Sequence, residues 1–196
     1  TLSEESSSKN VFTAYSIEVY DKLTEALVGK SGLVPFSISP KKTKDLNVDL
    51  PIANPKLWSP ETPDLYIVKC FIVRVSGKEI FPIDEFIFNY GFRDLRFKSG
   101  AILVNGTQLQ LMGVMWQEDH PFFGSAMTYE ALEKDVAIMK TAGVNFIRFL
   151  YPPHPYMLNL CDRYGLFVIE EIPFTQVPSA IYEKEFYTEQ AENYTK

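Results

Sequence analysis

The amino-acid sequence predicts an all-β domain followed by an α/β domain, with the change near residue 98. Three observations support this prediction. Short apolar strands separated by proline and glycine run up to residue 97, an Asn-Gly hairpin signal stands at residues 105–106, and strands alternate with helices from there on. The first pattern is typical of a β-sandwich, and the last is typical of a parallel sheet with crossover helices.

The first domain, residues 11–97, is predicted to contain short strands in the order in which the apolar runs occur. The segment 66–75 (YIVKCFIVRV) alternates most regularly, and Ser76-Gly77-Lys78 turns the chain after it. A turn and a short strand are expected between residues 21 and 30. The other predicted strands are 11–20, 33–38, 46–50 and 86–97. The polar residues 1–10 are assigned to a disordered or linker segment.

The second domain, residues 98–196, begins with a hairpin around Asn105-Gly106, in which residues 101–104 pair with residues 108–111. Thr128 is expected to cap the first helix and Gly143 to end it, and Ser179 is expected to cap a last helix that starts at Ala180. Three nearly continuous apolar strands and a second helix complete the α/β pattern, so we expect a parallel sheet. These strands are 111–116, 144–150 and 166–169, and the second helix is 155–164.

Composition excludes several classes of partner and cofactor. The chain has 19 Lys and Arg against 25 Asp and Glu, and no basic stripe, so nucleic acid is not an expected partner. No apolar run approaches the ~18 residues of a membrane helix. Cys70 and Cys161 are expected to be buried free thiols, and together with His120 and His154 they have no zinc spacing. We therefore expect no metal, no cofactor and no membrane partner. The sequence does not fix the cellular compartment, and a periplasmic or secreted location is possible.

Several sequence blocks follow one another in a recognisable order, and the pattern extends from about residue 40 to residue 172. The blocks are 54–66 (NPKLWSPETPDLY), 91–93 (GFR), 103–106 (LVNG), 111–114 (LMGV), 118–121 (EDHP) and 162–165 (DRYG). Taken together they resemble glycoside hydrolase family 2, which includes β-galactosidases, β-glucuronidases and β-mannosidases. The resemblance implies an immunoglobulin-like β-sandwich followed by a (β/α)8 barrel. It also implies retaining hydrolysis of a β-linked glycan by two glutamates.

The length limits what this resemblance can mean for the chain itself. A complete barrel typically needs ~250 residues, whereas the whole chain has 196. We count three barrel strands, and in the family the catalytic glutamates follow the fourth and the seventh. We therefore expect a partial barrel with no catalytic residue in this chain, inactive alone and prone to self-association through its open strand edges. The alternative is a non-catalytic module that binds carbohydrate or a partner protein.

The predicted site lies at the carboxyl ends of the barrel strands, where the loops of such barrels hold their chemistry. Its candidates for substrate binding or active-site support are Gln117, Asp119, His120, Arg148, Tyr151 and Glu171. A charge inside VNFIRFL must be paired or functional, so Arg148 either serves the site or pairs with Glu170 or Glu171. In the family the matching arginine points to the nucleophile. Adjacent strand residues face opposite sides, so Glu170 and Glu171 do not form a catalytic pair.

Two further features bear on specificity and on packing. Gln117 stands where β-galactosidases have a histidine, and Phe149-Leu150-Tyr151 replaces two small residues and a histidine, which argues against a lactose-type substrate. Trp58 is expected to pack where its segment crosses the sandwich, with stacking on a sugar as the alternative. Arg93 is expected to be an interdomain anchor rather than a ligand contact.

Overall fold

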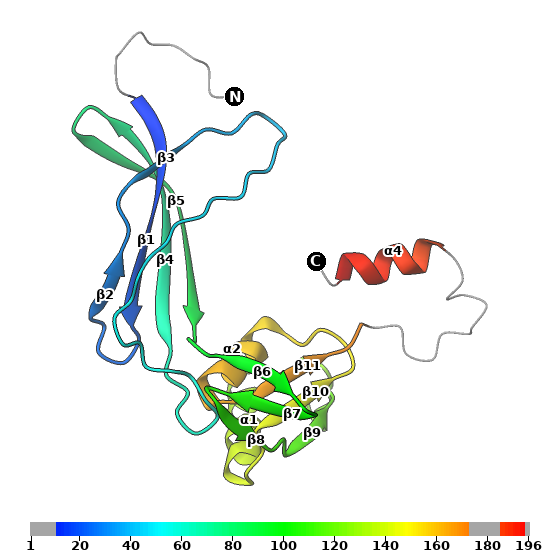
Figure 1. The fold of residues 1–196 in the computed structure, drawn as a ribbon. Coiled ribbons are helices and arrows are strands. Elements are labelled where there is room, and N and C mark those ends of the chain that lie inside the picture. The colour runs from blue at the N-terminus through cyan, green and yellow to red at the C-terminus, as the bar shows by residue number, and fades with distance from the viewer. Residues whose placement is uncertain (1–10, 173–184, 195–196) are drawn as a thin grey trace. The chain divides into compact units, whose positions relative to one another are not determined.

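The computed structural model describes residues 11–172 and 185–194, so the predicted linker at residues 1–10 and the predicted helix cap at Ser179 lie outside the described residues (Figure 1). The chain divides into two compact units. Unit 1 comprises Thr1–Lys56 and Asp64–Phe92, and unit 2 comprises Leu57–Pro63 and Arg93–Lys196. A segment from the middle of the predicted sandwich therefore belongs to the second unit.

Unit 1 contains a five-stranded antiparallel sheet with the order β2-β1-β4-β5, in which β3 also pairs with β1 (Figure 1). Its central pair is long because both sequences alternate, and all eleven residues of β1 find partners in β4. The side chains of Val19, Tyr66 and Val68 form its buried core together with Leu50 and Ile52 from the irregular segment 37–56. The strands are β1 (Val11–Asp21), β2 (Leu27–Lys30), β3 (Val34–Phe36), β4 (Tyr66–Ser76) and β5 (Glu79–Tyr90).

Two strand predictions in this unit are wrong. Residues 46–50 form no strand, because this segment covers the sheet with side chains and does not pair with it through backbone hydrogen bonds. The predicted strand 86–97 is two elements: β5 ends at Tyr90 and β6 begins at Leu95. The break is fixed by Asp94, whose backbone N–H donates to the Asn105 side chain and whose carbonyl accepts from the Asn105 N–H.

Unit 2 begins with a three-stranded antiparallel sheet and continues as a three-stranded parallel sheet of order β11-β10-β9 (Figure 1). The Asn-Gly hairpin is confirmed, with Asn105 at φ 53° and Gly106 at φ 82°. No barrel is closed by the described strands, as the chain length predicts. The strands are β6 (Leu95–Lys98), β7 (Ala101–Val104), β8 (Thr107–Leu109), β9 (Gly113–Trp116), β10 (Phe146–Phe149) and β11 (Phe167–Glu170).

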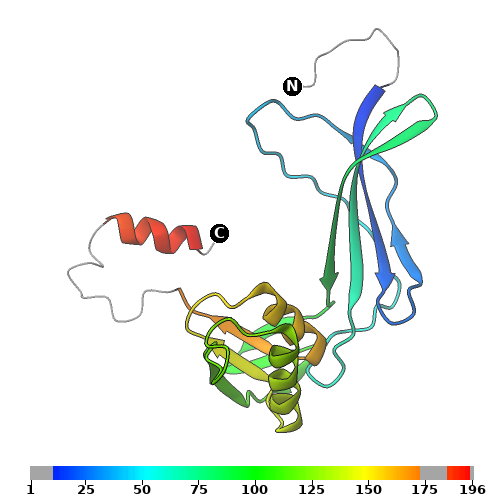
Figure 2. The same cartoon turned by 180° about the vertical axis from the view of Figure 1, so that it is seen from behind.

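Two crossover helices, α1 (Tyr129–Thr141) and α2 (Pro155–Tyr164), connect the parallel strands, and α4 spans Glu185–Tyr194 (Figure 2). Helices α1 and α2 begin where the sequence predicts. The Thr128 hydroxyl accepts from the Ala131 N–H at the start of α1, and Gly165 at φ 70° ends α2. Apolar side chains of both helices and of β10 form the core of this unit, which includes Leu132, Val136, Ile147, Phe149, Met157, Leu160, Cys161 and Leu166.

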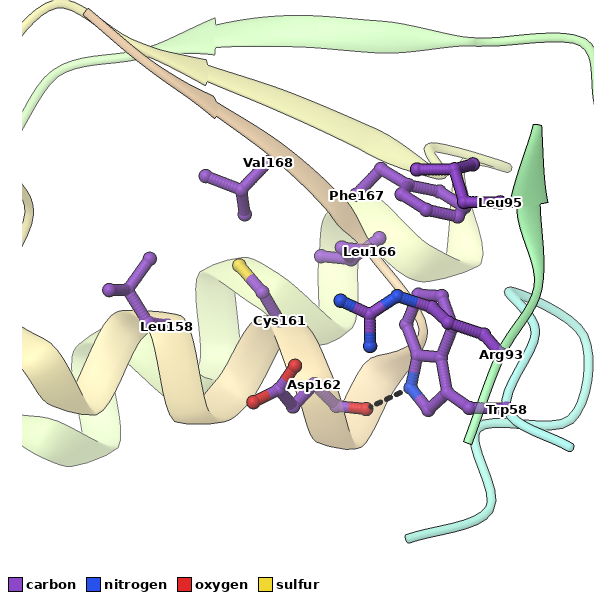
Figure 3. Close-up of a pocket in the computed structure, with 9 residues that line it drawn as sticks. All are labelled: Trp58, Arg93, Leu95, Leu158, Cys161, Asp162, Leu166, Phe167 and Val168. Carbon is purple, nitrogen blue, oxygen red and sulfur yellow. Dashed lines mark hydrogen bonds between the residues drawn. The ribbon is translucent and has the colours of Figure 1, made fainter. Parts of the chain in front are cut away.

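The segment Leu57–Pro63, hereafter the strap, is held in unit 2 by its backbone and by one indole. The Trp58 side chain is 2% exposed, and its Nε1 donates to the Asp162 carbonyl oxygen at 2.8 Å (Figure 3). Lys140 Nζ donates to the Pro60 carbonyl at 2.6 Å, and the Asn105 amide donates to the Trp58 carbonyl. Trp58 is a buried packing residue as predicted, but the predicted place on the sandwich is wrong, because its partners lie in the α/β unit.

Candidate active-site edge

The carboxyl ends of the three parallel strands lie level with one another. Phe149 pairs with Trp116 on one side and with Glu170 on the other, so the residues that follow all three strands emerge at one edge of the sheet. All six residues of the predicted site lie at this edge. Gln117, Asp119 and His120 follow β9, Arg148 and Tyr151 lie in and after β10, and Glu171 follows β11.

Arg148 occupies the sheet face that does not contact the helices. Its strand neighbours Ile147 and Phe149 are buried in the helix-packed core, and side chains alternate along a strand, so the guanidinium points to the opposite face. The register places Met115 and Ile169 on either side of Arg148, and both are more than half exposed. In a closed barrel this row faces the interior.

Glu171 is the ionic partner of Arg148. The Arg148 Nε donates to the Glu171 carboxylate, and the Glu171 backbone N–H donates to the Phe149 carbonyl at 2.9 Å. The carboxylate is more enclosed than the guanidinium, with 24% of the Glu171 side chain exposed against 52% of the Arg148 side chain. The Arg148 guanidinium and the Glu171 carboxylate thus lie side by side on the sheet face opposite the helices, hereafter the inner face.

A tight loop follows β9 and is shaped by His120. The His120 N–H donates to the Gly124 carbonyl at 3.0 Å, and the Gly124 N–H returns a bond of 2.8 Å to the His120 carbonyl. The imidazole Nδ1 accepts from the Phe122 N–H, and its ring stacks on Phe123 at 4.7 Å between centroids. These contacts give His120 a structural role in this loop, and they leave Phe122 88% exposed at its tip.

Glu118, which lies in the block 118–121 (EDHP) after β9, joins two loops at the same edge. Its Oε1 accepts from the His154 backbone N–H at 3.0 Å, and its own N–H donates to the Tyr151 hydroxyl at 3.3 Å. His154 itself caps α2, with its Nδ1 accepting from the Tyr156 N–H. Its position two residues after a parallel strand marks Glu118 as a candidate from the sequence, whereas its partners in the loop after β10 are known only from the structure.

Metal ligands, membrane-spanning helices and the cysteines were further candidates for function in the described parts of the chain. No group of three His, Cys, Asp or Glu side chains among residues 11–172 and 185–194 is placed to hold a metal ion. Within the same ranges no helix has the length and apolarity needed to cross a membrane. Both cysteines are free, and burial raises the pKa of the Cys161 thiol to about 12. Cys70 is only half-buried, contrary to the prediction.

A pocket of about 270 Å³ lies at the opposite end of the sheet, beside the strap (Figure 3). Trp58 forms one wall, with the Arg93 guanidinium 5.3 Å from its ring and Phe167 edge-on at 5.1 Å. The remaining lining comes from Leu95 in β6, from α2 and from the start of β11. Because barrel enzymes act at the carboxyl ends of their strands, this pocket lies away from the candidate site.

Two family models match the chain and together cover nearly all of it. The model described as glycosyl hydrolases family 2, TIM barrel domain, matches residues 95–194, and the model described as glycosyl hydrolases family 2 matches residues 2–93.

Solved structures give the same resemblance. The β-glucuronidase of Parabacteroides merdae is 30% identical, and the match covers 83% of this chain and 19% of that chain, with a TM-score of 0.68. The β-glucuronidase of Bacteroides uniformis is 27% identical over 92% of this chain and 21% of that chain, with a TM-score of 0.76. A glycosyl hydrolase family 2 member from Bacteroides cellulosilyticus is 26% identical over 92% and 24%, with a TM-score of 0.74. The chain thus spans about a fifth of the length of these proteins.

Proposed function

This chain belongs to glycosyl hydrolase family 2, and we propose that it forms one part of a retaining β-glycosidase. In this proposal residues 11–97 are the immunoglobulin-like domain and residues 98–196 are the first part of the catalytic barrel. The observation that carries the proposal is the placement of Arg148 on the inner face of the parallel sheet, beside Glu171 and level with the loops after β9 and β10.

The chemistry assigned to this edge is binding and orientation. Retaining hydrolysis needs two carboxyl groups about 5–5.5 Å apart across the scissile bond. Glu170 and Glu171 are sequence neighbours on opposite sides of a strand end, and Glu171 is engaged by Arg148. The catalytic glutamates are therefore assigned to barrel strands other than these three. A fixed guanidinium favours the ionised form of a nearby carboxylate, which suits a nucleophile.

The proposed substrate is a β-linked glycan, with β-glucuronides as the first class to test. Two similar solved proteins are β-glucuronidases at 27–30% identity. Gln117 and Tyr151 replace residues that the family's β-galactosidases use at this edge, so a β-galactoside is the weaker candidate. Tyr151 and Arg148 are the groups we assign to contact the glycan or to order the residues that do.

Activity on aryl β-glycosides tests this proposal. The full-length protein that contains this chain is expected to hydrolyse an aryl β-glucuronide faster than the β-galactoside, and Arg148→Met is expected to lower the rate strongly. The 196-residue chain alone is expected to be inactive. No turnover by the full-length protein on any β-glycoside would favour a non-catalytic module that binds carbohydrate or a partner protein. Turnover by the 196-residue chain would contradict the assignment of the catalytic residues.

We also propose that the isolated chain associates with itself. The outer edges of β9 and β11 are unpaired within the described sheet, and the exposed side chains of Met115 and Ile169 add apolar surface on one face of it. Light scattering over a concentration series is expected to give a mass above that of one chain. A single monomeric mass at all concentrations would refute this.

A further inference from the structure

We propose that Glu118 is a positioning residue that fastens the loop after β9 to the loop after β10 and so sets the place of the Tyr151 hydroxyl. This inference rests on the proposed function, since it assigns Tyr151 a task in glycan binding. Two hydrogen bonds define the clasp: Glu118 Oε1 accepts from the His154 N–H at 3.0 Å, and the Glu118 N–H donates to the Tyr151 hydroxyl at 3.3 Å.

The sequence of the loop after β10 offers few other backbone donors that could hold this loop in place. Residues 152–155 read Pro-Pro-His-Pro, and proline has no backbone N–H. The His154 N–H is therefore the only backbone donor in these four residues, and Glu118 takes it. The three prolines also restrict φ, so the loop has few ways to move once this one donor is held.

A carboxylate suits this place for a second reason. His154 is the N-cap of α2, and the first N–H groups of a helix lack intrahelical acceptors and attract negative charge. The His154 imidazole accepts from the Tyr156 N–H, while Glu118 accepts from the His154 N–H. Glu118 thus supplies an acceptor to the N-terminal end of α2 from a different loop.

The hydrogen bond from the Glu118 N–H also determines whether the Tyr151 hydroxyl donates or accepts toward a ligand. Its oxygen accepts from the Glu118 N–H, which leaves the phenolic hydrogen to donate to another acceptor. Tyr151 is 38% exposed at the edge where Arg148 and Glu171 lie. We therefore assign Tyr151 as a hydrogen-bond donor to a hydroxyl or carboxylate oxygen of the glycan, and Glu118 as the residue that orients it.

The experiment compares Glu118→Ala, Glu118→Gln and Tyr151→Phe in the full-length protein, with Glu130→Ala as the matched control. Glu130 lies exposed in the first turn of α1 in the same unit. Glu118→Ala is expected to lower kcat/KM for the aryl β-glycoside by about tenfold or more, as for a lost hydrogen bond to a charged group. Glu118→Gln keeps an acceptor oxygen and is expected to restore most of the activity, and Glu130→Ala is expected to be unchanged.

Two readouts separate positioning from mere stability. In the Tyr151→Phe background the additional loss from Glu118→Ala is expected to shrink. Alanine keeps the backbone N–H, so Glu118→Ala acts on Tyr151 only by releasing the loop that places its hydroxyl. Hydrogen exchange of the 150–157 peptide is expected to accelerate in Glu118→Ala but not in Glu118→Gln. The inference would be overturned if the fold-losses in kcat/KM of Glu118→Ala and Tyr151→Phe multiply in the double variant. It would also be overturned if Glu118→Ala leaves the hydrogen exchange of the 150–157 peptide unchanged. If the unmodified protein hydrolyses no β-glycoside, the proposed function fails and the assigned role of Tyr151 with it, while the exchange data still decide whether the clasp exists.

Discussion

Replacing Gly165 by alanine tests the contact between the strap and the turn after α2. Gly165 adopts φ 70°, and a Cβ built on it would lie 2.5 Å from the Pro60 carbonyl oxygen and 2.9 Å from the Pro60 carbonyl carbon and Cα. These are backbone atoms, so the strap itself must move to admit the methyl group. Gly143 is the matched control, because its φ is 84° and no atom lies within 4 Å of its Cβ position.

The structure sets the size of the expected difference. At both positions an alanine must adopt the left-handed conformation, which costs about 1–2 kcal/mol of folding free energy. Gly165→Ala adds an overpacking cost of about 1–3 kcal/mol, because displacement of Pro60 also disturbs the bond from Lys140 Nζ to its carbonyl. We expect Gly165→Ala to lower the free energy of unfolding of unit 2 by about 2–5 kcal/mol, against about 1–2 kcal/mol for Gly143→Ala.

Tryptophan fluorescence during urea unfolding measures this difference in one unit. The chain has two tryptophans, Trp58 and Trp116, and both belong to unit 2. Excitation of these indoles therefore reports on unit 2 without a signal from unit 1. If the two variants unfold at the same urea concentration, the strap does not pack on the Gly165 turn and the reasoning is refuted.

Three further substitutions are expected to act through single hydrogen-bonded groups. Lys140→Met removes the donor to the Pro60 carbonyl and should cost unit 2 about 1–3 kcal/mol by the same fluorescence assay, whereas an unchanged midpoint would contradict the contact. Asn145→Ala removes the side-chain bonds that hold the chain before β9, to the Met112 N–H and the Gln110 carbonyl, and should cost about 1–2 kcal/mol in that assay. The hydrogen bond from Lys56 lowers the pKa of the Asp21 carboxyl from 3.8 to about 2, so this carboxylate stabilises the folded state above about pH 4, and the contribution is lost as the pH falls through about 2. Thermal melts followed by circular dichroism should therefore show wild type above Asp21→Asn near pH 6 and the two converging near pH 2; a constant gap would argue against the ion pair.

Local signals explain what the sequence predicts well. The helix α2 is predicted over its observed range because proline begins it and glycine ends it within a few residues. Likewise the six predicted site residues lie at one edge because parallel strands end in register. The Arg148–Glu171 pair is one of the two pairings expected from residues alone.

Contacts between distant residues explain what the sequence does not predict. Trp58 and Asp162 are 104 positions apart, and no local pattern in the strap tells which unit will receive the indole. Glu118 and His154 are separated by 36 positions and meet only because β9 and β10 pair in parallel. Residues 46–50 have the composition of a strand, but they do not pair with a strand: Leu50 packs on the sheet through its side chain, and the Asn47 carbonyl accepts from the Tyr15 hydroxyl.

Because of the strap, the boundary between the two units is not a single point in the sequence. The polypeptide passes between the two units at three peptide bonds, after Lys56, after Pro63 and after Phe92. A single crossover between the two matched family segments would therefore take the Trp58 indole from one parent and the turn of α2 whose carbonyl accepts from it from the other. A chimera that replaces the α/β unit of this chain is therefore expected to need the seven residues of the strap from the same parent as the turn at Gly165.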